Sequence, residues 1–141
     1  MNPMDHAAVM NSCDAKAERV GLSALSEVER VVVLVNRVNF EVIQGGLTTF
    51  FYNSAGNHAA ETVPALVAVG ADKAATALQS AMALFPGGSP PADRDERYDG
   101  WRAVSGSLAP FDDPFTEKGI DVFDLLCSYI EAHAVELREH M

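Results

Sequence analysis

The sequence predicts an all-α fold, a single compact domain of about six helices. Its 141 residues, 48% of them hydrophobic, are enough to form one buried core without disulfides or a metal. Apolar residues recur at steps of three and four along several segments, which is the spacing of one helix face, and no segment keeps the alternation of a strand. We expect a flexible or partly helical lead-in over residues 1–22 and one all-helical domain over residues 23–141.

The first strong helix begins at Ser26. Ser26 is followed three positions later by Glu29, a pair in which each side chain bonds the other's main-chain amide at a helix start. The apolar face that follows consists of Val28, Val31, Val32, Val35, Val38 and Val42. This spacing predicts a helix over residues 26–44, and Gly45 is expected to end it in the left-handed conformation that favours glycine.

Residues 41–56 predict a corner between this helix and the rest of the chain. Leu47, Phe50 and Phe51 have the spacing of the buried face of a short second helix. Asn53 and Gly56 are typical of the turn that follows. Each of these residues has a structural explanation, so the stretch predicts a helix–turn–helix corner and no active site.

A helix is expected over residues 57–69, which Pro64 kinks or shortens. Three further helices complete the predicted domain. The first covers residues 71–85 and ends at the only linker-like loop, residues 86–91. The next begins at Asp93, with Tyr98 and Trp101 facing inward. The last covers residues 120–139, with His133 on its inner face as a core histidine.

The charge of the chain limits its partners. Twenty acidic and ten basic residues give a net charge of -10, which argues against direct nucleic-acid binding and against anionic membranes. Most of the excess lies after residue 92, where the chain has twelve acidic and five basic residues. A basic protein is the expected partner. The longest β-branched run, residues 31–35, is too short to span a bilayer, and we expect a bacterial protein in the cytoplasm.

Patterns of enzymes are missing from the sequence. Cys13 and Cys127 lie far apart and outside any CxxC pair, and His58 and Glu61 supply only two of the ligands that a catalytic zinc needs. The sequence contains no GxSxG, GxGxxG or GxxxxGK[ST] pattern. We therefore predict no metal and no cofactor, and we favour a protein without enzymatic activity.

Two groups of polar residues are candidate sites. The first group punctuates apolar helix ends and forms either helix caps with a salt bridge or a small ligand site; it consists of Glu41, Gln44, Asn53, Arg94 and Arg97. The second is an acidic patch around the start of the last helix, and carboxylates along rigid helices can approximate the phosphate tracks of duplex DNA. The patch consists of Asp112, Asp113, Glu117, Asp121, Asp124 and Glu131.

A series of short motifs links the chain to a known family. In order they are Leu25-Ser26 with Glu29-Arg30, Glu41-Val42, Gly45-Gly46, Phe50-Phe51, Asn53-Ser54, Gly56, Gly70-Ala71, Leu84-Phe85-Pro86, Pro91, Asp93-Arg94, Arg97, Tyr129-Ile130 and His133. Over residues 25–133 the chain resembles the bacterial DNA-mimic protein family, a domain of unknown function shared with a Neisseria DNA-mimic protein. The resemblance implies an all-α fold. For the described member it implies binding of a helix-turn-helix transcription factor through an acidic surface that mimics DNA. The acids of that surface are not part of the matched motifs, so no binding residue is transferred.

The leading hypothesis is an acidic, non-enzymatic binding protein, monomeric or homodimeric. Its partner would be a basic protein such as a DNA-binding regulator, engaged through the acidic patch. One alternative is a small-molecule-binding protein or enzyme that uses the first polar group. Another is an immunity or antitoxin-like protein that neutralises a basic partner.

Overall fold

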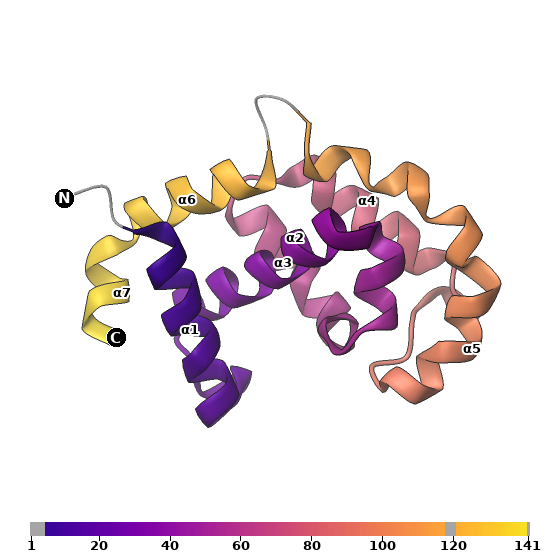
Figure 1. Ribbon diagram of the computed structural model, residues 1–141, viewed down its shortest axis with the longest axis horizontal. Coiled ribbons are helices and arrows are strands. Elements are labelled where there is room, and N and C mark those ends of the chain that lie inside the picture. Colours follow the sequence, from indigo (N-terminus) through magenta and orange to yellow (C-terminus); the bar gives the residue numbers. More distant parts are fainter. Residues whose placement is uncertain (1–4, 118–120, 141) are drawn as a thin grey trace.

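The computed structural model describes residues 5–117 and 121–140, and these residues form α-helices joined by turns and 3-10 segments, without a strand. The prediction of an all-α fold is confirmed (Figure 1). None of the helices in this part of the chain combines the length and the hydropathy needed to cross a membrane. The α-helices are α1 (His6–Val20), α2 (Glu27–Tyr52), α3 (Ala59–Ala68), α4 (Asp72–Ala83), α5 (Arg94–Val104), α6 (Val122–Ala132) and α7 (Ala134–His140).

Helix α2 runs through the middle of the molecule, and α1, α3, α5 and α6 all pack against it (Figure 1). Its start is the predicted capping box: the Ser26 hydroxyl accepts from the Glu29 amide at 3.1 Å, and the Glu29 carboxylate accepts from the Ser26 amide at 3.0 Å. The predicted valine face is buried along the whole helix. A helix contacted on so many sides needs an apolar surface wider than one stripe, and Val33 and Leu34 are buried as well.

A kink at Gly45 and Gly46 divides α2 into a long first part and the predicted short aromatic part. The left-handed glycine is Gly46, with a φ of 78°, whereas Gly45 is extended with a φ of -168°, so the assignment to Gly45 was wrong. The kink leaves the Leu47 amide without a helical acceptor, and Asp112 Oδ1 accepts from it at 2.8 Å. A Cβ on Gly46 would meet the Asp112 carboxylate. The corner is therefore fastened by a residue far along the chain.

Within residues 1–22, for which we expected a flexible or partly helical lead-in, His6–Val20 form a 15-residue helix packed on the core. Asp5 caps α1 by accepting from the Ala8 amide at 3.1 Å, and Val9 and Cys13 lie one helical turn apart on its buried face. Lys16 joins α1 to the buried Glu29 at 3.0 Å. Burial alone would raise the pKa of Glu29, but the Ser26 amide and Lys16 outweigh it and lower this pKa. Alanines and polar residues between the buried positions concealed this helix in the sequence.

The later helices follow the prediction with three differences. Helix α3 accommodates Pro64 in its interior, and its Val67 is 53% exposed. Tyr98 of α5 is 43% exposed, because Arg97 takes the inward position instead. The expected single last helix is divided at His133 into α6 and α7. Its predicted start at residue 120 lies outside the described residues.

Candidate functional site

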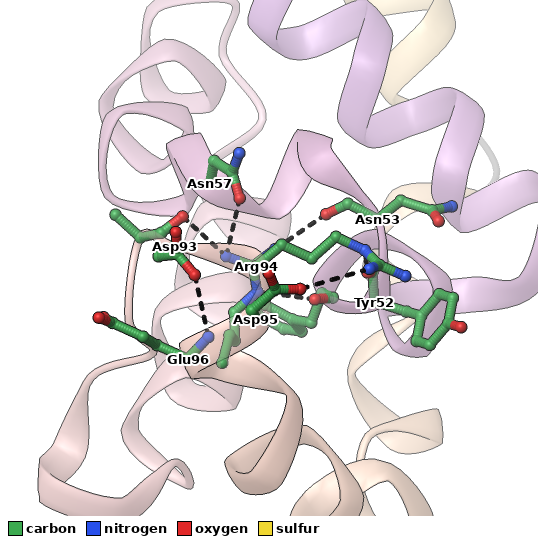
Figure 2. A network of polar contacts seen from close by, with 10 residues as sticks. Tyr52, Asn53, Asn57, Asp93, Arg94, Asp95 and Glu96 are labelled. Atoms are coloured by element: carbon green, nitrogen blue, oxygen red, sulfur yellow. Dashed lines mark hydrogen bonds and ion pairs between the residues drawn. The ribbon is translucent and has the colours of Figure 1, made fainter.

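The centre of the first polar group is Arg97, which is fully buried (0% exposed) between α5 and the end of α2. Its guanidinium donates to acceptors of the protein, and Figure 2 shows two of the residues that supply them, Asn53 and Asn57. Nε bonds Phe51 O at 2.7 Å, Nη2 bonds Asn53 O at 2.9 Å, and Nη1 bonds Asn57 Oδ1 at 3.1 Å, Pro91 O at 3.0 Å and Ala92 O at 3.1 Å. Arg97 thus supplies the donors that the last carbonyls of α2 need.

The other members of the group have separate surroundings. Arg94 Nε donates to Tyr52 O at 2.7 Å, and its guanidinium lies 4.6 Å from the centre of the Tyr52 ring. Asn53 Nδ2 donates to Glu41 Oε2 at 3.0 Å, and Gln44 is exposed. The structure therefore brings Arg94 and Arg97 together as a joint between α2 and α5, while Glu41 lines a groove on another side of α2.

That groove has a volume of about 400 Å³ and lies between α1, α2 and the 3-10 segment Ser54–His58. Its lining residues are Asn11, Asp14, Ala15, Glu18, Asn36, Arg37, Phe40, Glu41, Ser54 and Ala55. Of these lining residues, only Glu41 was a candidate from the sequence, because residues 1–22 were expected to be a lead-in. The spacing of Asp14 and Glu18, one helical turn apart, was the signal that could have revealed the α1 wall.

The acidic patch combines structural and free carboxylates. Asp112 holds the α2 kink, and Asp121 caps α6 by accepting from the amides of Phe123 and Asp124 at 2.9 and 3.3 Å. Asp113 and Asp124 are exposed. Of the remaining two members, Glu117 forms an exposed ion pair with Lys73 at 3.3 Å, and Glu131 Oε1 lies within hydrogen-bond distance of His6 Nε2, at 2.9 Å.

Asp112 holds the α2 kink through its bond to the Leu47 amide. We expect its negative charge, in contrast, to disfavour folding. Burial raises its pKa, the Leu47 amide lowers it, Asp113 raises it, and the net direction is upward. The folded state therefore binds the Asp112 proton more tightly than the unfolded chain does. The part of the stability that depends on this proton is present at low pH and is lost as pH rises through the folded pKa. Asp112→Asn keeps an acceptor for Leu47 and should be at least as stable as wild type at pH 7. Any advantage should vanish near pH 3. Asp112→Ala loses the acceptor and should cost about 1–2 kcal/mol. Urea unfolding of wild type and both variants at both pH values measures these free energies. Equal losses of stability for Asp112→Asn and Asp112→Ala at pH 7 would contradict the expectation.

Three arginines donate to main-chain carbonyls, and one of them, Arg94, also lies 3.9 Å from the carboxylate of its exposed neighbour Asp95. Arg30 donates to Leu22 O at 3.2 Å and to Leu25 O at 3.0 Å, in the same manner as Arg94 and Arg97. These arginines satisfy the acceptors left at helix ends and turns. Arg30 and Arg97 form no ion pair among the described contacts, so these two positive charges leave the surface carboxylates less neutralised by direct pairing.

Nothing in residues 5–117 and 121–140 gathers three potential metal ligands. His58 forms an ion pair with Glu61 at 3.3 Å. Burial, followed by the charge of Glu29, raises the pKa of the Cys13 thiol to about 11, and burial also raises the pKa of Cys127. A thiol needs a lowered pKa to act as a nucleophile near neutral pH, so neither cysteine has the environment of a reactive residue.

Comparison with known proteins identifies the family. Comparisons with curated proteins and with solved structures give no match. A family model described as DMP19-like protein matches residues 23–133, nearly the stretch over which the motifs predicted the relationship. These residues extend from the turn before the α2 capping box to the end of α6. The chain therefore belongs to the family of DMP19-like proteins.

Proposed function

We propose that this protein is a non-enzymatic binding protein whose acidic surface occupies the DNA-binding surface of a basic regulator. Membership of the DMP19-like family and the net charge of -10 support the proposal. The observation that carries it is the use of Arg30, Arg94 and Arg97 as donors to main-chain carbonyls. A protein that needs an uncompensated negative surface gains from basic residues that face inward.

Within the acidic patch, Asp113 and Asp124 are the residues proposed to meet the partner. Both are exposed, and neither caps a helix or closes an ion pair among the described contacts. Asp112 and Asp121 contribute to the fold, as their bonds to main-chain amides indicate. Glu117 and Glu131 extend the patch; Glu117 is partly neutralised by Lys73, and Glu131 contacts His6.

The function is tested by capture followed by competition. The protein is immobilised and exposed to extract of its native cell at low salt, and proteins released by salt are identified by mass spectrometry. Each released DNA-binding protein is purified and bound to its labelled duplex, and free DMP19-like protein is then added. The proposal expects the duplex to be displaced at an equimolar ratio. Simultaneous binding of the duplex and this protein by every captured regulator would refute DNA mimicry.

Removing two charges from the patch should weaken the complex selectively. Asp113→Asn combined with Asp124→Asn is expected to raise the dissociation constant about 5-fold at low salt, because each exposed charge contributes a few tenths to 1 kcal/mol. The difference in dissociation constant between the variant and wild type should shrink at about 0.5 M salt, because screening there leaves little interaction between exposed charges. Surface plasmon resonance with the captured regulator measures both values.

The matched control removes the same number of charges elsewhere. Glu61→Gln on α3 combined with Glu96→Gln on α5 changes two exposed residues and leaves the patch intact. It is expected to change the dissociation constant by less than about 2-fold, since only the long-range field is altered. Equal effects of the two double variants would show that the patch has no special role.

A further inference from the structure

The groove on α2 has two walls and a floor that come from separate parts of the chain. Asp14 and Glu18 of α1 form one wall, Phe40 and Glu41 of α2 lie along the floor, and Ser54 begins the opposite wall. Helix α1 and the 3-10 segment after α2 both contact α2. A groove of about 400 Å³ falls within the range of ligand-binding pockets.

Arg37 holds the α1 wall in place. Its Nε donates to Asp14 Oδ1 at 2.7 Å, and its Nη2 donates to Glu18 Oε1 at 3.1 Å. Glu18 remains 75% exposed in this contact. Each carboxylate uses one oxygen here, and a carboxylate can accept up to about four hydrogen bonds. The wall therefore keeps acceptor capacity in a fixed position, so a cationic ligand would not have to order it.

The floor offers a third carboxylate and an aromatic ring. Asn53 holds Glu41 by donating to Oε2 at 3.0 Å, and Phe40 is 59% exposed although it lies on the central helix. The carboxylates of Asp14, Glu18 and Glu41 carry three negative charges. The guanidinium of Arg37 carries one positive charge, so the lining of the groove has a net charge of -2. An exposed phenylalanine beside uncompensated carboxylates matches a ligand that is both cationic and able to stack.

We propose that this groove binds an arginine side chain presented by a basic segment of the protein partner. The guanidinium would stack on the Phe40 ring and donate to Glu41 and to the wall carboxylates. Arginine fits better than lysine because its planar guanidinium stacks on rings and donates to two acceptors at once. The inference deepens the proposed function and rests on its basic partner, but it assigns the arginine to residues outside the acidic patch.

The probe is a blocked five-residue peptide, Gly-Arg-Gly-Arg-Gly, with counterparts in which lysine or citrulline replaces arginine. Each is titrated into the ¹⁵N-labelled full chain at constant ionic strength. The arginine peptide is expected to shift the amide signals of Arg37, Phe40 and Ala55 with a dissociation constant on the order of 1 mM. The lysine peptide should bind more weakly, and the uncharged citrulline peptide should leave these signals unchanged.

Two variants assign the binding to the groove. Glu41→Gln keeps an acceptor for Asn53 and removes the charge, and Phe40→Ala removes the ring from an exposed position. Each is expected to weaken binding of the arginine peptide about 2- to 5-fold. Glu61→Gln, which removes one charge from α3, should leave the dissociation constant within about 1.5-fold of wild type. The dispersion of the amide spectrum verifies that each variant is folded.

The inference is overturned if the arginine peptide shifts no groove amide, if citrulline shifts them equally, or if Glu41→Gln and Glu61→Gln have the same effect. These readings use the peptide alone, whereas the proposed function is measured on a captured regulator with the Asp113 and Asp124 variants. If the peptide does not bind the groove, the proposal that the protein displaces DNA still stands. If the protein does not displace DNA, the result of the peptide titration still stands.

Discussion

Replacing Arg97 with methionine is expected to lower the free energy of unfolding by about 4 kcal/mol, on the scale measured when one member of a buried charged network is removed. Methionine fills a similar length but donates no hydrogen bond. The carbonyls of Phe51, Asn53 and Pro91 would then lose the guanidinium that now bonds them. An acceptor left unsatisfied in a buried position costs about 1–3 kcal/mol. Urea unfolding followed by circular dichroism measures the loss.

Arg102 provides the matched control on the same helix. It is exposed near the end of α5, so Arg102→Gln should change the free energy of unfolding by less than about 0.5 kcal/mol. Arg97→Lys should fall between the two variants, because lysine offers three donors from one atom while the acceptors surround a planar fork of three nitrogens. Similar values for Arg97→Met and Arg102→Gln would show that the network does not stabilise the fold.

Arg97 also shows what sequence could and could not provide. It has helical spacing with Trp101 and the buried Val104, so a periodicity search extended to charged residues would have placed it inside. The acceptors Phe51 O and Asn53 O could not be predicted, because they lie at the end of α2, 46 and 44 positions earlier in the chain. Local rules state that helix ends need donors, but not which distant residue supplies them.

The same division holds elsewhere in the molecule. The capping box at Ser26 and the helix start at Asp93 depend on residues close together in the chain, and both were predicted from the sequence. The groove was not predicted, because it requires α1, α2 and the segment after α2 to lie together. Among the candidate acids, burial distinguishes the clamp Asp112 from its exposed neighbour Asp113, and no local pattern separates two adjacent aspartates.

Gly46→Ala is expected to cost about 3–4 kcal/mol, the second largest effect. Gly46 combines a φ of 78° with a ψ of -176°, a region that is nearly exclusive to glycine and costs other residues about 1–3 kcal/mol. The added Cβ would also meet the Asp112 carboxylate, which must then leave the Leu47 amide, at a further cost of about 1–2 kcal/mol. Urea unfolding of the variant and of wild type at pH 7 gives the difference.

Gly21 is the matched control, because a side chain there meets the backbone strain without the contact with Asp112. Its φ of 87° and ψ of 152° lie in nearly the same region, but a Cβ there would meet no atom within 4 Å. Gly21→Ala should therefore show the strain alone, about 1–2 kcal/mol less than Gly46→Ala. In an Asp112→Ala background the obstacle is absent, and Gly46→Ala should cost about as much as Gly21→Ala. If its cost stays the same with and without Asp112, the aspartate does not fasten the kink, and the corner is held by the packing of Leu47, Phe50 and Phe51 alone.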